Sequence, residues 1–131
     1  MKQLAERIKP YFQLLRIGNL LFIAILLYVM EKWVATPLLQ LAQFYEQMPW
    51  WVLTLLIMST ICIAAGGYII NDYFDVKIDR INHPEDLVVT RYISREGAMR
   101  LFQVLTILGV IMGLVVAWWA RSWTLVMIFI V

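Results

Sequence analysis

The sequence predicts an all-α membrane protein, built as a polytopic bundle of transmembrane helices. Hydrophobic residues make up 63% of the 131 positions, and the mean hydropathy is +0.77. Both values lie well outside the range of soluble globular domains. Two stretches, 50–70 and 101–120, contain no charged residue, and each reaches the roughly 20 residues that a helix needs to cross the hydrocarbon core. We therefore expect the chain to lie in a lipid bilayer.

The first expected span covers 12–34. Its apolar run, 20–30, has only eleven residues, too few for a crossing. The helix becomes long enough if it extends back through Arg16 and Asn19 or forward past Glu31, whose charged end can reach water along its aliphatic stem. Polar residues within a span favour a cavity over lipid, so Arg16 and Asn19 are expected to face a cavity.

Two further spans are expected at 50–70 and 99–120, separated by a cytoplasmic loop at 71–98. Ser94 precedes the third span at the position of a helix N-cap. A fourth apolar run, 122–131, stops after ten residues, which is less than half a crossing. We therefore expect residues 1–131 to be the N-terminal part of a single transmembrane domain.

Small residues recur every four positions in the third span, at Gly109, Gly113 and Ala117. This spacing lets a second helix approach closely, and we expect these residues to serve packing. Gly66 and Gly67 in the second span are expected to do the same.

Basic residues are distributed unevenly between the connections. Four precede the apolar run 20–30 and five lie between the apolar runs 50–70 and 101–120, whereas the segment 31–49 has only Lys32. Lys and Arg accumulate on cytoplasmic loops, so the N-terminus and the 71–98 loop are expected to face the cytoplasm, in a bacterial inner membrane. We expect no nucleic-acid partner.

The uncharged run 50–70 ends in the sequence NDYFDVKIDR, at 71–80. No proline or glycine occurs between Tyr68 and Asn82, so the second helix can continue through the acidic residues. At about 100° per residue, with Asn71 at 0°, Asp75 lies near 40°, Asp79 near 80° and Asp72 near 100°. One helix face therefore carries every carboxylate, over an axial length of roughly 12 Å.

Three carboxylates on one face repel each other, and the helix dipole disfavours negative charge at a C-terminus. A bound cation would relieve this repulsion. Carboxylate and amide oxygens suit Mg²⁺, whose coordination is usually completed by water and substrate phosphates. The face therefore indicates a site for a metal-bridged diphosphate, although such a charged run is often only a solvated helix end.

Two other enzyme classes fit the aspartates less well. CDP-alcohol phosphotransferases also carry aspartates four residues apart, but their pattern needs an Asp-Gly dipeptide, which does not occur, and an Ala-Arg dipeptide upstream, which is absent before the aspartates. Soluble isoprenyl diphosphate synthases have aspartate-rich helices but no uncharged spans of this length.

The segment NDYFDVKID is similar to the NDxxDxxxD signature of the UbiA superfamily of intramembrane prenyltransferases. The following DRINHPEDLVVTRYISREGA resembles the connection of that family, with Asp86 and Leu87 in place of the usual basic residue and proline. The segment VVTRYISRE resembles members described as geranylgeranylglycerol-phosphate geranylgeranyltransferase-like. The resemblance implies the first three to four helices of a UbiA-like nine-helix fold, without the second aspartate-rich signature of the later helices.

The resemblance also implies Mg²⁺-dependent transfer of a prenyl group from an isoprenyl diphosphate to a small aromatic or glycerol phosphate-type acceptor. Asn71 and Asp75 would bind Mg²⁺ directly, and Asp72 and Asp79 would complete or support the metal site. The expected catalytic residues are Asp72, Asp75 and Asp79, and the expected substrate-binding residues are Arg16, Asn19, Tyr68 and Arg80. A second hypothesis is that a chain of this length is a catalytically inert membrane fragment or interaction module.

Overall fold

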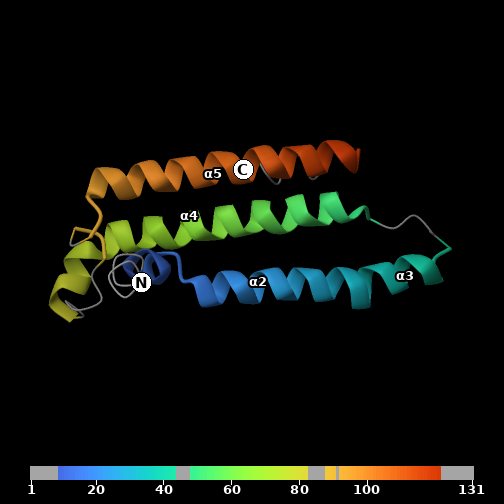
Figure 1. Cartoon of the computed structure of the whole chain (residues 1–131), viewed down its shortest axis with the longest axis horizontal. Helices are drawn as coiled ribbons and strands as arrows, with labels where there is room; N and C mark the ends of the chain where they lie inside the picture. The colour runs from blue at the N-terminus through green and yellow to red at the C-terminus, as the bar shows by residue number, and fades with distance from the viewer. Residues whose placement is uncertain (1–8, 44–47, 83–87, 91, 122–131) are drawn as a thin grey trace, which may run out of the picture.

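The long helices α2, α4 and α5 lie side by side, with α4 between α2 and α5 (Figure 1). The computed structural model describes residues 9–43, 48–82, 88–90 and 92–121, with the backbone alone for 77–82. Its elements are α2 (Ile17–Met30), η1 (Glu31–Ala35), α3 (Thr36–Leu41), α4 (Trp50–Asn82) and α5 (Arg95–Trp119). The described residues contain no β-strand, which confirms the all-α prediction. The expected fourth span, 122–131, lies outside the described residues.

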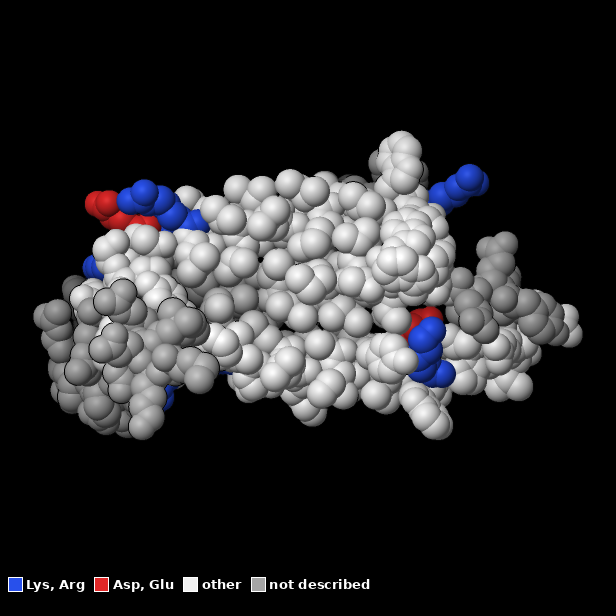
Figure 2. Space-filling view, in the orientation of Figure 1, with Lys and Arg blue, Asp and Glu red and all other residues white. Residues whose placement is uncertain are grey.

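Within the part of the chain that the structure describes, three helical segments are long and apolar enough to cross a membrane, namely Ile17–Leu41, Trp50–Val76 and Arg95–Trp119. On the face shown in Figure 2, the coloured Lys, Arg, Asp and Glu side chains lie at the two ends of the bundle and the middle carries none. Many large apolar side chains are exposed on the outer faces of these helices, as a lipid environment requires. The chain is therefore an integral membrane protein.

The first span is not one continuous α-helix. Residues 9–14 are helical, the helix breaks before α2, and a π-helical turn, η1, leads into α3. The π turn lies just ahead of Pro37, whose ring would clash with the carbonyl of Trp33 in a regular α-helix, so a widened turn accommodates the proline. The helical segment ends at Leu41, seven residues beyond the expected end of 12–34.

Glu31 differs from the sequence expectation. It is only 9% exposed, and its Oε1 accepts a hydrogen bond from the Thr36 hydroxyl at 3.1 Å. The helix continues past Glu31 to Leu41, so this side chain sits within the helical segment instead of reaching water from its end.

Helices α4 and α5 pack closely at Gly109. A Cβ built there would meet Ile63 Cγ1 at 2.6 Å and the Ser59 carbonyl oxygen at 3.0 Å, and the Ser59 hydroxyl donates to the Gly109 carbonyl at 2.7 Å. Gly113 and Ala117 are also buried. The expectation that these small residues serve packing is confirmed.

The two glycines of α4 differ from one another. A Cβ at Gly66 would meet Thr106 Oγ1 at 2.9 Å, whereas Gly67 has nothing within 4 Å. Only Gly66 therefore packs closely against α5, and the expectation for Gly67 is wrong within the described residues.

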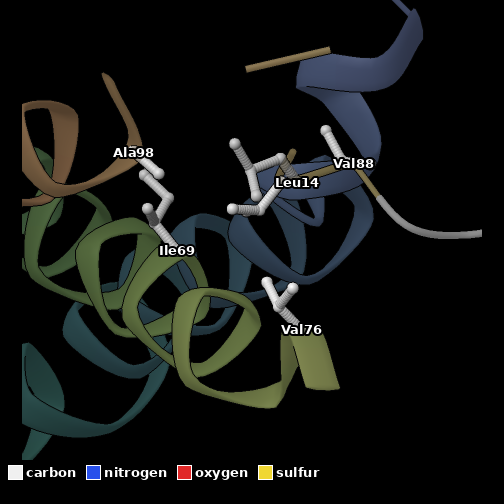
Figure 3. Close-up of a cluster of buried hydrophobic side chains, with 6 residues drawn as sticks. Leu14, Ile69, Val76, Val88 and Ala98 are labelled. Carbon is white, nitrogen blue, oxygen red and sulfur yellow. The ribbon is translucent and has the colours of Figure 1, made fainter. Parts of the chain in front are cut away.

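The amino-terminal end of α5 is capped as predicted, since Ser94 Oγ accepts a hydrogen bond from the Gly97 N–H at 3.0 Å. The turn before the cap places Val88 and Val89 in a buried cluster with Leu14, Ile69 and Ala98 (Figure 3). Val76 is also part of this cluster. Four segments distant in sequence thus meet at the end of the bundle that carries the acidic residues.

Candidate functional site

The acidic face lies on α4, which continues through the aspartates to Asn82. Helical periodicity adds Tyr68 to this face, since a residue three positions before Asn71 lies near 60° on the same projection. Asn71 and Asp75 are exposed and Asp72 is partly buried, with 26% of its side chain exposed. The side chains of Asp79 and Arg80 lie outside the described residues.

Arg16 brings the start of the first span onto this face. Its guanidinium Nη2 lies 3.4 Å from Asp72 Oδ1, and its Cζ lies 5.1 Å from the centre of the Tyr68 ring. Three predicted site residues, Arg16, Tyr68 and Asp72, therefore meet in one cluster, although Arg16 and Asp72 are 56 residues apart.

The metal donors are only partly brought together. Among the described residues, no group of three or more His, Cys, Asp or Glu side chains is placed to hold a metal ion. Asn71 and Asp75 lie one helical turn apart, and neither side chain forms a hydrogen bond or ion pair with another described residue. An exposed amide and an exposed carboxylate suit Mg²⁺, which takes few protein ligands and keeps water or phosphate in its other positions. The donor chemistry of this pair therefore fits the expected ion.

Arg16 and Asn19 line one open pocket of about 510 Å³. Lys9, Phe12 and Gln13 complete it, together with Ile17 and Gly18. The sequence interpretation missed Lys9, Phe12 and Gln13. The spacing of Lys9 and Gln13 places these two on one face of the helix of residues 9–14, but the left-handed Arg16 that brings them beside α2 has no local sequence signal.

A second cationic contact lies on another side of α4. The Cζ of Arg95 lies 4.4 Å from the centre of the Tyr73 ring, and both residues line an open pocket of about 500 Å³ with Glu96, Met99 and Arg100. Tyr73 falls near 200° on the same projection, so this pocket does not share the acidic face.

Comparison with known proteins gives a family match and several relatives. Residues 32–131 match the UbiA prenyltransferase family. No solved structure matches.

Three similar proteins share one name and come from archaea. Digeranylgeranylglyceryl phosphate synthase of Sulfurisphaera tokodaii is 34% identical over 81% of this chain, and the protein of that name from Sulfolobus acidocaldarius is 32% identical over 82%. The corresponding protein of Ignicoccus hospitalis is 47% identical over 44% of the chain. The aligned part covers 35%, 37% and 19% of these proteins, so the chain spans about a third or less of the length of these relatives. Archaeal relatives give no support to the expected bacterial inner membrane.

Proposed function

The chain belongs to the UbiA prenyltransferase family, and we propose that the intact protein transfers a prenyl group from an isoprenyl diphosphate to a glycerol phosphate-type acceptor. One observation of this structure supports the proposal above others. Asn71 and Asp75 are exposed on one face of α4, at the end of a membrane span, without a partner among the described residues. Such a face suits a diphosphate that is delivered with a divalent cation.

Mg²⁺ is the proposed cofactor, held by Asn71 and Asp75, with Asp79 as a third donor. When bound, Mg²⁺ would neutralise the diphosphate leaving group and so help the allylic C–O bond to ionise. Asn19 and Arg80 are proposed to bind the donor, and the apolar faces of the spanning helices would hold the prenyl chain. Diphosphate would leave as the allylic C–O bond breaks, the acceptor hydroxyl oxygen would bond to the allylic carbon, and the hydroxyl proton would pass to water or to the released diphosphate.

The acceptor is proposed from the relatives. Their shared name describes a glyceryl phosphate that carries two geranylgeranyl groups, so a glyceryl phosphate that already bears one such group is the expected acceptor. The corresponding donor is geranylgeranyl diphosphate. An aromatic quinone precursor, the other acceptor expected from the sequence, is not favoured by these names.

Product analysis tests this proposal directly. The intact protein in detergent is incubated with geranylgeranyl diphosphate, Mg²⁺ and a panel of acceptors, and products are identified by mass spectrometry. We expect one added geranylgeranyl group on geranylgeranylglyceryl phosphate and none on 4-hydroxybenzoate. Transfer to the aromatic acid alone would replace the proposed acceptor, and absence of transfer to every acceptor would refute prenyl transfer.

The second hypothesis, an inert membrane fragment, concerns these 131 residues alone. The chain holds one acidic motif, and the family resemblance implies a second motif on later helices. We expect the isolated 131-residue chain to give no turnover in the assay in which the intact protein is active. Robust activity of the isolated chain would show that a second motif is not needed.

A further inference from the structure

Arg16 has a backbone conformation that residues other than glycine rarely adopt. Its φ of 49° and ψ of 52° are left-handed. Its N–H donates to the Gln13 carbonyl at 2.9 Å, and its own carbonyl accepts from the Asn19 N–H at 2.8 Å. Arg16 thus closes the helix of residues 9–14 and opens α2. Glycine is the usual residue at such a junction, so an arginine there points to a use for its side chain.

The Arg16 side chain holds two residues of α4 at once. Asp72 and Tyr68 are four positions apart, so they are neighbours on one helix face. A planar guanidinium can offer its N–H edge to a carboxylate and its flat face to an aromatic ring. The 3.4 Å contact with Asp72 and the 5.1 Å contact with Tyr68 match these two roles.

The segment that carries Arg16 is itself fixed in place. Leu14 is fully buried against Val76, Ile69 and Val88, as Figure 3 shows. Because Leu14 is two residues before Arg16, the guanidinium is tethered close to α4 rather than presented on a free terminal segment.

The contact between Arg16 and Asp72 divides the acidic face into two parts. Asp72 is paired with a cation from another helix, whereas Asn71 and Asp75 have no partner among the described residues. Pairing Asp72 also reduces its repulsion with Asp75, which lies three positions away on the same face.

We propose that Arg16 is a positioning residue that acts through Asp72. Arg16 fixes the Asp72 carboxylate and the Tyr68 ring against the start of α2, and this leaves Asn71 and Asp75 to the divalent cation of the donor site. Asp72 is then the counter-ion of Arg16 and not a metal ligand. This proposal rests on the proposed function, and it replaces the substrate-binding role expected for Arg16 from the sequence.

The test is a double-mutant cycle in the intact protein with Arg16→Gly, Asp72→Asn and the combination. Glycine is chosen because it accepts the left-handed backbone and removes only the guanidinium. We expect Arg16→Gly to lower kcat by about 10- to 100-fold, the usual cost of losing a residue that orients another. Its KM for the isoprenyl diphosphate should change by less than about threefold, because a positioning residue makes no direct contact with the bound substrate.

The combined variant shows whether Arg16 acts through Asp72 or directly on the substrate. If Arg16 acts through Asp72, adding Arg16→Gly to Asp72→Asn causes no further loss of kcat. If the loss of kcat in the combined variant equals the product of the two single losses, Arg16 does not act through Asp72. That result, or an increase of KM with an unchanged kcat in Arg16→Gly, would mean that Arg16 binds the substrate directly and would overturn the proposal. Arg16→Lys keeps the positive charge but lacks the planar guanidinium, so it should retain more activity than Arg16→Gly.

Arg100→Ala is the matched control, because Arg100 forms an exposed ion pair of nearly the same length, 3.5 Å, with Glu96. It should leave kcat and KM unchanged. Loss of activity with Arg100→Ala as large as with Arg16→Gly would overturn a specific role for the Arg16 contact.

Two readouts do not depend on turnover, so they separate this proposal from the proposed function. Mn²⁺ binding, followed by electron paramagnetic resonance, should be weakened by Asp75→Asn but not by Arg16→Gly or Asp72→Asn. Hydrogen exchange at the amides of Leu15 and Asn19 should accelerate equally in Arg16→Gly, Asp72→Asn and the combination. Weaker Mn²⁺ binding in Asp72→Asn, or unchanged exchange in Arg16→Gly, would overturn the positioning role even if no prenyl transfer is found.

Discussion

Charge compensation decides which residues of the acidic face are free to bind a cation. The Arg16 to Asp72 pair is partly exposed, at 49% and 26% of the two side chains, and such pairs contribute only about 0–1 kcal/mol to stability. The left-handed backbone of Arg16 costs roughly 1–3 kcal/mol. The pair does not repay this cost, so its value lies in orienting Asp72 and not in stabilising the fold.

Asp75 is the residue whose loss should matter most. Asp75→Ala in the intact protein removes the exposed carboxylate beside Asn71, and we expect kcat/KM for prenyl transfer to fall by at least about 100-fold, as when a group that stabilises developing charge is lost. The measurement is product formation against Mg²⁺ concentration. Glu96→Ala is the control, because Glu96 is 88% exposed and its described ion pair is with Arg100; retained Mg²⁺-dependent turnover in Asp75→Ala would refute the metal assignment.

The sequence predicts the acidic face but not the contact that divides it. Asn71 and Asp75 can be placed on one face because helical periodicity is a local property. The approach of Arg16 to Asp72 depends on a left-handed residue between two helices and on the burial of Leu14, and neither follows from local propensity. Arginine is an unusual residue at such a junction, so no sequence rule would have placed a helix break there.

At the scale of elements, the packing of α4 against α5 follows from small residues. Gly109, Gly113 and Ala117 were predicted as a packing face from their spacing, and they are buried. The same reasoning failed for Gly67, because spacing identifies a small residue but not the direction from which another helix approaches. The π turn at Glu31–Ala35 was not predicted either, although Pro37 gives it a local cause.

Substitution of Gly109 should disrupt the α4 and α5 contact. In Gly109→Ala the new methyl group would lie 2.6 Å from Ile63 Cγ1 and 3.0 Å from the Ser59 carbonyl, and since the latter is backbone, the helices must separate. We expect a loss of about 1–3 kcal/mol, typical of overpacking, measured by thermal denaturation of the chain in detergent.

Gly67→Ala is the matched control in the same chain. Nothing lies within 4 Å of its Cβ position, and alanine is favoured over glycine within a helix by up to about 1 kcal/mol. Stability should stay the same or increase. Equal destabilisation by both substitutions would mean that close packing at Gly109 is not the cause.

The cap of α5 should be measurable by itself. Ser94→Ala removes the acceptor of the Gly97 N–H and should cost about 1 kcal/mol, with faster hydrogen exchange at Gly97. Ser94→Asp keeps an acceptor and adds a charge that the helix dipole favours, so exchange should stay slow. Fast exchange in both variants would show that the side-chain oxygen does not protect this amide.

At the scale of the whole molecule, the antiparallel order of α2, α4 and α5 determines which residues share a side of the membrane. The start of α2, the end of α4 and the start of α5 lie at one end, and the end of α3 lies at the other (Figure 1). Basic residues concentrate at the first of these ends, in the sequence before the first span and after the second. The rule for Lys and Arg therefore predicts that the acidic face is on the cytoplasmic side.

Cysteine labelling of the intact protein in whole cells tests this orientation. In a Cys62→Ala background, single cysteines replace Lys9, Glu96, Ala42 and Ala120, which are all exposed. An impermeant maleimide should label the Ala42 and Ala120 positions in intact cells, and the Lys9 and Glu96 positions only after the membrane is opened, because charged reagents do not cross the hydrocarbon core. The reverse pattern would invert the proposed orientation, and disagreement within either pair would contradict the antiparallel arrangement of the three spans.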